Sequence, residues 1–195
     1  TPALNPAIAG TPTSLLLWDS VRLPGTAAEK SSLAAALASF AAAANGVVID
    51  LATDTRIAAL NAQADANTAI PLAKNLVAET IRNLILRCRA TAPSIRDITL
   101  VGSDDVIPFF RKNDGAQLAG EFNYYPPVKD GTHSQSSLRL NQVLTQDRYG
   151  SSTQISLATG PYDLPELPVG RLVENATEIQ AYLNAYAPLF NGSST

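Results

Sequence analysis

The stretch SLLLWDSVRLPGTAAEKSSLAAALASFAAAANGVVIDL, residues 14–51, decides the fold. It opens with a continuous apolar run, Ser14–Trp18, whose length is typical of a strand buried on both faces. Thr26-Ala-Ala-Glu29 is a capping-box pattern, which predicts that a helix begins there. Asn45-Gly46 closes that helix with a residue of positive φ, and Val47–Leu51 is a second buried strand. Strand, helix and strand in this order imply a right-handed parallel crossover.

The alternation of helices and strands continues beyond this stretch. A long helix is predicted from Leu72 to Pro93, and the third strand is Asp97–Val101, which Gly102 ends. The apolar stripe of the long helix consists of Leu72, Leu76, Val77, Ile81, Leu84, Ile85 and Cys88. A last helix begins at Asn175–Glu178, which resembles a capping box. Its apolar face is formed by Ala176, Ile179, Tyr182, Leu183 and Tyr186.

These elements predict an α/β fold with three layers, α/β/α, around a mostly parallel sheet of about four strands in a Rossmann-like topology. We expect the first strand to be central, with the second on one side and the third on the other. We assign one α/β domain to residues 14–190, an extended lead-in to 1–13 and a tail to 191–195. Residues 55–64 are expected to form a short helix, and residues 112–142 a long surface excursion.

Composition limits the classes of function that need to be considered. Hydrophobic residues make up 46% and charged residues 16%, which is typical of a globular chain with a core. A net charge of −3 without a run of Lys and Arg predicts no nucleic-acid partner. No apolar run reaches the roughly 18 residues of a membrane span, so we expect no membrane insertion. Because Met is absent throughout, we expect a fragment or a processed product.

Cys88 and His133 are the only thiol and the only imidazole in the chain. A nucleophilic cysteine needs an exposed position beside a base that lowers its pKa. Cys88 instead lies near the end of the predicted helix, on its apolar stripe, where the helix dipole disfavours a thiolate. We therefore interpret Cys88 as a core residue and His133 as a solvated residue of a polar loop, and we assign no catalytic residue.

Several carboxylates follow predicted strands and are candidates for a structural or metal-binding role. They are Asp19, Asp104, Asp105 and Asp147. Ligands of open α/β sheets bind beyond the carboxyl ends of the strands, and clusters of oxygen ligands of this kind hold Ca²⁺. The alternative is capping and turn formation, in which Asp accepts hydrogen bonds from nearby backbone N–H groups. We favour the capping interpretation, because the spacing of a calcium-binding loop is absent, and expect no other cofactor.

Arg171 ends a predicted strand, and an arginine at such a place often holds a loop carboxylate. Asp105 and Asp147 are the partners that we consider first. Tyr124, Tyr125 and Tyr149 either line a groove or pack the loops onto the core, and we favour packing.

Three stretches together resemble the gingipain-like peptidases, a family of cysteine peptidases with a caspase-like fold. Ile98-Thr-Leu-Val-Gly-Ser-Asp-Asp-Val-Ile-Pro-Phe109 is similar to the "LVGDxxxIPF" strand and loop of this family. Leu144–Gly150 is similar to a segment that carries an Asp-x-Tyr-Gly element. Leu164–Val173, followed by the helix from Asn175, is similar to "P-[DE]-x-x-V-G-R-[LF]" and its helix. The order and spacing of the three stretches carry the resemblance.

The resemblance implies a place within a larger protein and not an activity of this chain. In the family, two α/β subdomains adjoin, and the Gly-Arg segment with its helix lies at their junction. The catalytic His and Cys follow later strands, so neither His133 nor Cys88 matches them. The expected function is that of a non-catalytic N-terminal subdomain that supports a downstream catalytic subdomain, with Arg171 at the junction. By the same analogy, the parent is a bacterial, secreted or surface-bound hydrolase.

Two other functions remain open from the sequence. A binding or adhesion module of a bacterial surface protein would reuse the fold without a peptidase partner. A complete small enzyme would use the acidic cluster with a metal ion. The residues that follow Thr195 in the natural precursor would distinguish the first alternative from the peptidase interpretation, because the family places a His-Gly and a strand-terminal Cys there.

Overall fold

The computed structural model describes residues 6–190 except 117, 125, 158 and 159, so part of the predicted lead-in, the tail and Tyr125 lie outside the described residues. The chain forms two compact units. Of the described residues, the sheet unit comprises 6–53, Leu84–Ile107 and 167–190. The second unit, here called the ribbon unit, comprises Asp54–Asn83 and Pro108–Glu166.

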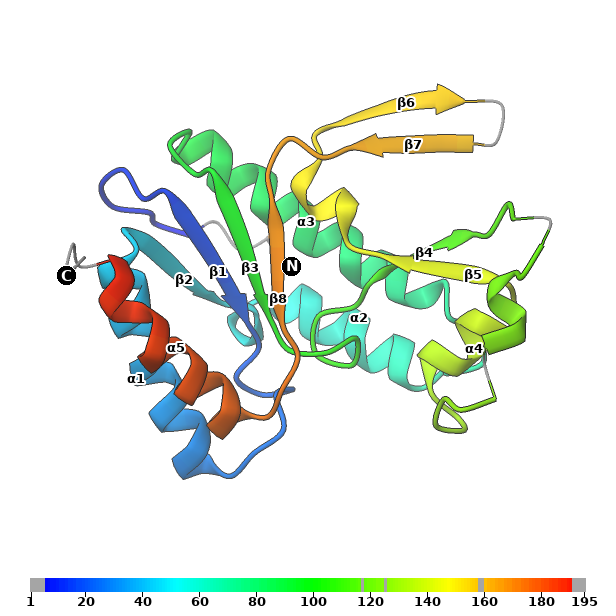
Figure 1. Ribbon diagram of the computed structural model, residues 1–195, viewed down its shortest axis with the longest axis horizontal. Coiled ribbons are helices and arrows are strands. Elements are labelled where there is room, and N and C mark those ends of the chain that lie inside the picture. Colours follow the sequence, from blue (N-terminus) through cyan, green and yellow to red (C-terminus); the bar gives the residue numbers. More distant parts are fainter. Residues whose placement is uncertain (1–5, 117, 125, 158–159, 191–195) are drawn as a thin grey trace. The chain divides into compact units, whose positions relative to one another are not determined.

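The sheet unit contains a four-stranded parallel sheet in the order β2-β1-β3-β8 (Figure 1). Its strands are β1 (Ser14–Trp18), β2 (Gly46–Asp50), β3 (Asp97–Val101) and β8 (Val169–Leu172). β1 is central between β2 and β3, which confirms the predicted order and the predicted number of strands. A short 3-10 helix, η1 (Leu51–Thr53), follows β2.

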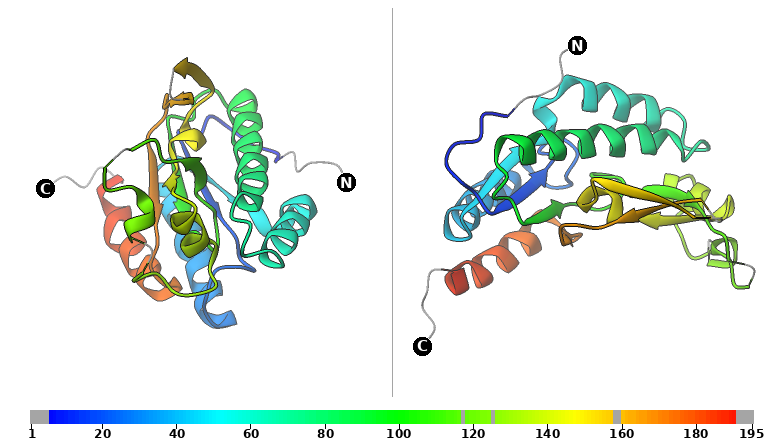
Figure 2. Two further views of the ribbon diagram at one scale, coloured as in Figure 1. Left: turned by 90° about the vertical axis from the view of Figure 1, so that its right-hand side faces the viewer. Right: turned by 90° about the horizontal axis from the view of Figure 1, so that it is seen from above.

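Helices cover both faces of this sheet. α1 (Ala27–Ala43) and α5 (Ala176–Phe190) lie side by side on one face, where the rings of Phe40 and Phe190 meet edge to face. The C-terminal half of α3 (Ala73–Thr91) lies on the other face (Figure 2). The buried core between these layers is apolar and includes Leu15, Leu16, Leu17, Leu33, Leu37, Leu84, Ile85, Ile98 and Leu100. The predicted α/β/α arrangement is therefore confirmed.

Local signals set the ends of the helices, as predicted. The Thr26 hydroxyl accepts from the backbone N–H of Glu29, and the Glu29 carboxylate accepts from the backbone N–H of Thr26, which completes a capping box. Asn175 and Glu178 exchange the same pair of bonds at the start of α5. Asn45 has φ 49°, the positive value expected where α1 turns into β2.

The ribbon unit consists of short helices, part of α3 and two pairs of short strands. It contains α2 (Thr55–Asp65), the N-terminal half of α3, η2 (Glu121–Tyr124), α4 (His133–Arg139) and η3 (Asp147–Gly150). β4 (Phe110–Asn113) pairs with β5 (Gln142–Thr145), and β6 (Thr153–Leu157) pairs with β7 (Gly160–Leu164), both antiparallel. The region expected to be a surface excursion, 112–142, thus contains a helix and parts of a two-stranded ribbon.

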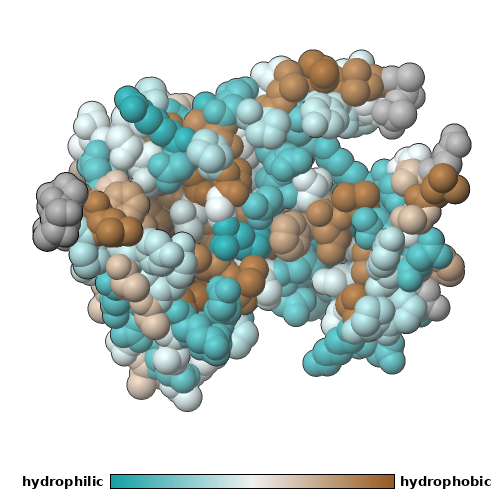
Figure 3. Space-filling view, in the orientation of Figure 1, coloured by the Kyte–Doolittle hydropathy of each residue, from teal (hydrophilic) through white to brown (hydrophobic). Residues whose placement is uncertain are grey.

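The β6–β7 hairpin has its apolar face turned outward. Cross-strand pairs place Ile155 opposite Tyr162, and Leu157 and Leu164 lie on the same face of the hairpin. All four side chains are exposed, and Figure 3 shows hydrophobic residues along this hairpin. The opposite face carries Asp163, which is buried.

Two predicted apolar stripes are less buried than expected. Leu72 and Leu76 are exposed although they fall on the apolar stripe of α3, and Tyr182 and Tyr186 of α5 are almost half exposed. The rest of the α3 stripe, from Val77 to Cys88, is buried as predicted. Helical spacing places side chains on one face, but the neighbouring elements decide how much of that face is covered.

Replacing Gly102 with alanine is expected to lower the free energy of unfolding by about 1–3 kcal/mol, because the backbone is strained for any residue with a Cβ. Gly102 has φ 124°, and an added Cβ would lie 2.6 Å from the Cβ of Val106. Urea denaturation followed by circular dichroism measures the change. Gly170→Ala is the matched control, because no atom lies within 4 Å of its added Cβ. A loss for Gly102→Ala no larger than that of the control would contradict the argument.

Candidate functional site

Cys88 is a core residue of the sheet unit. Its side chain is 1% exposed on the half of α3 that covers the sheet. Burial raises the pKa of the Cys88 thiol to about 11, while the nearby positive charge of Arg87 opposes the rise only in part. The interpretation of Cys88 as a core residue is confirmed, and a thiol in this environment is a poor nucleophile.

His133 belongs to the ribbon unit and is buried. It is the first residue of α4 and is 3% exposed, so the prediction that it is solvated is wrong. Its Nε2 lies 2.9 Å from the carbonyl oxygen of Ala64, near the end of α2. Burial lowers the pKa of the His133 imidazole, and the hydrogen bond to Ala64 opposes this effect only in part. The prediction failed because the polar segment that carries His133 folds into α4, and the imidazole then contacts the end of α2.

Asp19 organises the turn after β1. Its Oδ1 accepts hydrogen bonds from the backbone N–H groups of Val21 (3.0 Å) and Arg22 (2.9 Å). Burial raises the pKa of the Asp19 carboxyl although both hydrogen bonds favour its charged form. Asp50 acts in the same way after β2, where its Oδ1 accepts from the N–H groups of Ser20 and Ala52. These contacts are those of the turn-forming interpretation.

The other predicted acids are spread over both units. Asp104 is buried and Asp105 is exposed in the loop after β3, while Asp147 is an exposed residue of the ribbon unit. The backbone oxygen of Asp105 accepts a hydrogen bond of 2.8 Å from Nε of Arg22. Within the described ranges, no three His, Cys, Asp or Glu side chains are grouped as a metal site requires. The calcium hypothesis stays a prediction.

Arg171 holds the loop that follows β3. Its Nη1 donates to the backbone oxygens of Ile107 (2.7 Å), Gly102 (2.9 Å) and Ser103 (3.5 Å). Arg171 therefore clamps the loop after β3 through backbone carbonyl groups, and its predicted pairing with the carboxylate of Asp105 or Asp147 stays a prediction. The loop after β3 and the strand β8 thus meet within the sheet unit.

Tyr149 of η3 holds the segment around Pro108 within the ribbon unit. It is buried, its Oη donates to the backbone oxygen of Pro108 at 2.6 Å, and its ring packs on Phe110. The packing interpretation is confirmed for Tyr149. Tyr124, by contrast, is exposed on η2.

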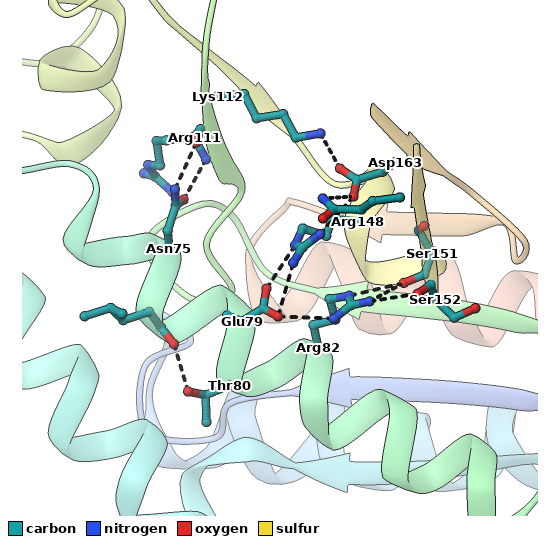
Figure 4. A network of polar contacts seen from close by, with 12 residues as sticks. Asn75, Glu79, Thr80, Arg82, Arg111, Lys112, Arg148, Ser151, Ser152 and Asp163 are labelled. Atoms are coloured by element: carbon teal, nitrogen blue, oxygen red, sulfur yellow. Dashed lines mark hydrogen bonds and ion pairs between the residues drawn. The ribbon is translucent and has the colours of Figure 1, made fainter. Parts of the chain in front are cut away.

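An ion-pair network that sequence reasoning missed lies at the centre of the ribbon unit (Figure 4). Arg148 of η3 bonds Glu79 of α3 through Nε at 2.9 Å and Asp163 of β7 through Nη1 at 3.0 Å. Asp163 also pairs with Lys112 of β4 and accepts from Gln154 of β6 at 2.8 Å. One buried carboxylate therefore connects β4, η3 and both strands of the hairpin.

Other side chains of the network hold backbone groups. Arg82 donates from Nε and Nη2 to the backbone oxygen of Ser151, at 3.1 and 3.0 Å, and pairs with Glu79. Asn75 accepts from the N–H of Arg111 and donates to its carbonyl oxygen, which ties α3 to β4. The partners are up to 69 residues apart in the sequence, so no local pattern could reveal them.

The network favours the charged forms of Asp163 and Arg148. Burial by itself raises the pKa of Asp163, but hydrogen bonds from Lys112, Gln154 and Arg148 outweigh it and lower the pKa below the usual value of 3.8. Burial likewise opposes the charge of Arg148, and the contacts with Glu79 and Asp163 outweigh it and raise its pKa. Because the Asp163 carboxylate is held ionised by cations, this arrangement suits a structural clamp rather than a general acid.

Asp163→Asn is expected to destabilise the protein by about 1–3 kcal/mol, because the change leaves Lys112 and Arg148 without their shared anion. Asp147→Asn is the control, since Asp147 is an exposed carboxylate of the same unit. The stabilisation from Asp163 should persist above about pH 4 and be lost as the pH falls through its lowered pKa. Urea denaturation at several pH values measures both effects, and equal losses for the two variants would refute the clamp.

Cys88 should resist alkylation in the folded protein, because the thiolate is the reactive form and its pKa is about 11. Iodoacetamide at about pH 8 is expected to modify the native chain only slowly and the urea-unfolded chain rapidly. Intact-mass spectrometry follows the reaction. Modification at equal rates in both states would show that Cys88 is accessible.

None of the helices among the described residues combines the length and the hydropathy needed to cross a membrane. Comparison of the chain with protein-family models, with curated proteins and with solved structures finds no match.

Proposed function

We propose that this chain is the non-catalytic N-terminal subdomain of a gingipain-like cysteine peptidase region and that it supports a downstream catalytic subdomain. The observation that carries the proposal is an uncovered aromatic surface beside the edge strand β8. The resemblance of the three stretches supplies the family, and the burial of Cys88 and of His133 argues against a catalytic role for either residue in this chain.

The uncovered surface, which we call the β8–α5 surface, combines a recess and exposed rings. The recess measures about 230 Å³ and is lined by Phe40, Thr99, Gly170, Arg171, Leu172, Tyr182 and Leu183. Tyr182 and Tyr186 stack with ring centroids 4.3 Å apart and are 46% and 43% exposed. Leu189, farther along α5, is more exposed still.

These features favour contact with another folded unit. Aromatic side chains and arginine are enriched in the centres of protein interfaces, where they offer a large area at little entropic cost. β8 ends the sheet order, so it forms one of the two edges of the sheet. Arg171 reaches from this edge to the loop after β3 and keeps that loop in place. A subdomain docked here would find a rigid surface.

The chain alone is expected to show no thiol-dependent peptidase activity, because its thiol is buried and protonated. Fluorogenic peptides with Arg or Lys before the scissile bond are the substrates for the assay, with and without iodoacetamide. Cleavage that iodoacetamide abolishes, and that Cys88→Ala also abolishes, would overturn the proposal.

The supporting role is tested with a longer chain that adds to residues 1–195 the next roughly two hundred residues of the natural precursor, the usual size of an α/β domain. Amide hydrogen exchange in α5 should slow in the longer chain relative to residues 1–195. Tyr186→Glu should reverse the slowing, whereas Asn184→Glu, at an exposed position of the same helix, should not. Unchanged exchange in α5 would remove the basis for docking at the β8–α5 surface.

A further inference from the structure

The end of α2 is held to α4 by the only histidine of the chain. His133 Nε2 lies 2.9 Å from the carbonyl oxygen of Ala64, and both residues are buried. A carbonyl oxygen only accepts, so Nε2 carries the proton and donates it to this bond. The same oxygen accepts from the backbone N–H of Asn67 at 2.8 Å. His133 of α4 therefore donates a hydrogen bond to a carbonyl group in the last turn of α2.

Two positively charged side chains and one carboxylate influence the protonation of this imidazole. Burial disfavours its protonation most, and the charges of Lys74 on α3 and Arg111 on β4 disfavour it further. Asp65 at the end of α2 favours protonation, but its Oδ1 is already engaged with the buried ammonium group of Lys74 at 3.0 Å. Of the other elements packed against α4, β5 has no ionisable side chain and η2 has Glu121 and Tyr124, while α4 itself ends in Arg139.

The side chains that α4 buries are polar. The helix has seven residues, and its buried side chains are the polar residues His133, Gln135 and Ser137. The Ser137 hydroxyl donates to the backbone oxygen of His133 and accepts from Nε of Arg111 at 3.2 Å. An isolated helix of this length is unstable in water, so α4 depends on these polar contacts.

We propose that His133 is an acid-released latch, which keeps α4 docked against α2 while the imidazole is neutral and lets α4 detach when the imidazole takes up a second proton. The second proton goes to Nδ1 and leaves the Nε2–H bond to Ala64 in place, but it makes the buried ring a cation near the charges of Lys74 and Arg111. Opening of α4 brings the charged ring into water, where its hydration is restored. The latch belongs to the ribbon unit and is independent of the proposed function.

The direction of the pH dependence follows from linkage. The imidazole of the docked state has a pKa below 6.5, whereas the open state titrates near 6.5. Between the two values the open state binds more protons, so acidification favours opening by up to about tenfold per pH unit. Docking is therefore fully retained above about pH 6.5 and weakens as the pH falls toward the lower pKa.

Two measurements on the unmodified chain test the latch. Because there is one histidine, the imidazole gives a single set of NMR signals, and it should titrate below 6.5. Hydrogen exchange of the α4 amides and of the Asn67 amide, corrected for the intrinsic exchange rate, should accelerate between about pH 7 and pH 5. The amides of β1 and β3 in the sheet unit should keep their protection.

His133→Gln is the matched variant, because glutamine donates to the Ala64 oxygen but does not titrate. In this variant the exchange rate of the α4 amides, corrected for the intrinsic exchange rate, should not depend on pH. This expectation holds even if the variant protects these amides more or less than the unmodified chain does. An imidazole that titrates at 6.5 or above, a flat α4 profile in the unmodified chain, or the same pH slope in the variant would each overturn the latch. The unmodified chain decides the question if the variant does not fold.

Discussion

The carbonyl groups of the loop after β3 need hydrogen-bond donors, and Arg171 provides them. Nη1 of this one side chain contacts the backbone oxygens of Gly102, Ser103 and Ile107. Gly102 makes the sharp exit from β3 with a positive φ, and the loop leads into Pro108, which Tyr149 holds from the ribbon unit. The segment from β3 to Ile107 is therefore held by Arg171 within the sheet unit, and Pro108 is held by Tyr149 within the ribbon unit.

The two units are stabilised in different ways. The sheet unit has the buried apolar layers that are typical of a parallel sheet covered on both faces. The ribbon unit relies on polar contacts, because its strands are short and its β6–β7 hairpin turns an apolar face outward. Asp163 holds that hairpin through Lys112, Arg148 and Gln154. Such a network gives a defined geometry more than it gives net stability, since burying charges has a high desolvation cost.

The chemistry of the only thiol and the only imidazole of the chain is compatible with the supporting role that we propose. The Cys88 thiol is kept protonated by burial, and the His133 imidazole is engaged with Ala64 inside the ribbon unit. Neither offers a reactive group at the surface. The surface next to β8, in contrast, presents stacked tyrosines and a recess, and contact with another folded unit is the simplest use of such a surface.

Local sequence patterns were sufficient to predict the strands and helices of the sheet unit, but they did not predict the contacts that hold the ribbon unit together. The apolar runs at Ser14–Trp18 and Asp97–Val101, with the capping box at Thr26, determined the strands, the first helix and the strand order, because buried parallel strands and helix ends have short-range signals. Only the tertiary structure decided that His133 is buried and that Arg148 meets Glu79 and Asp163. Those contacts join residues far apart in the chain, and their energy depends on burial, which no local spacing encodes.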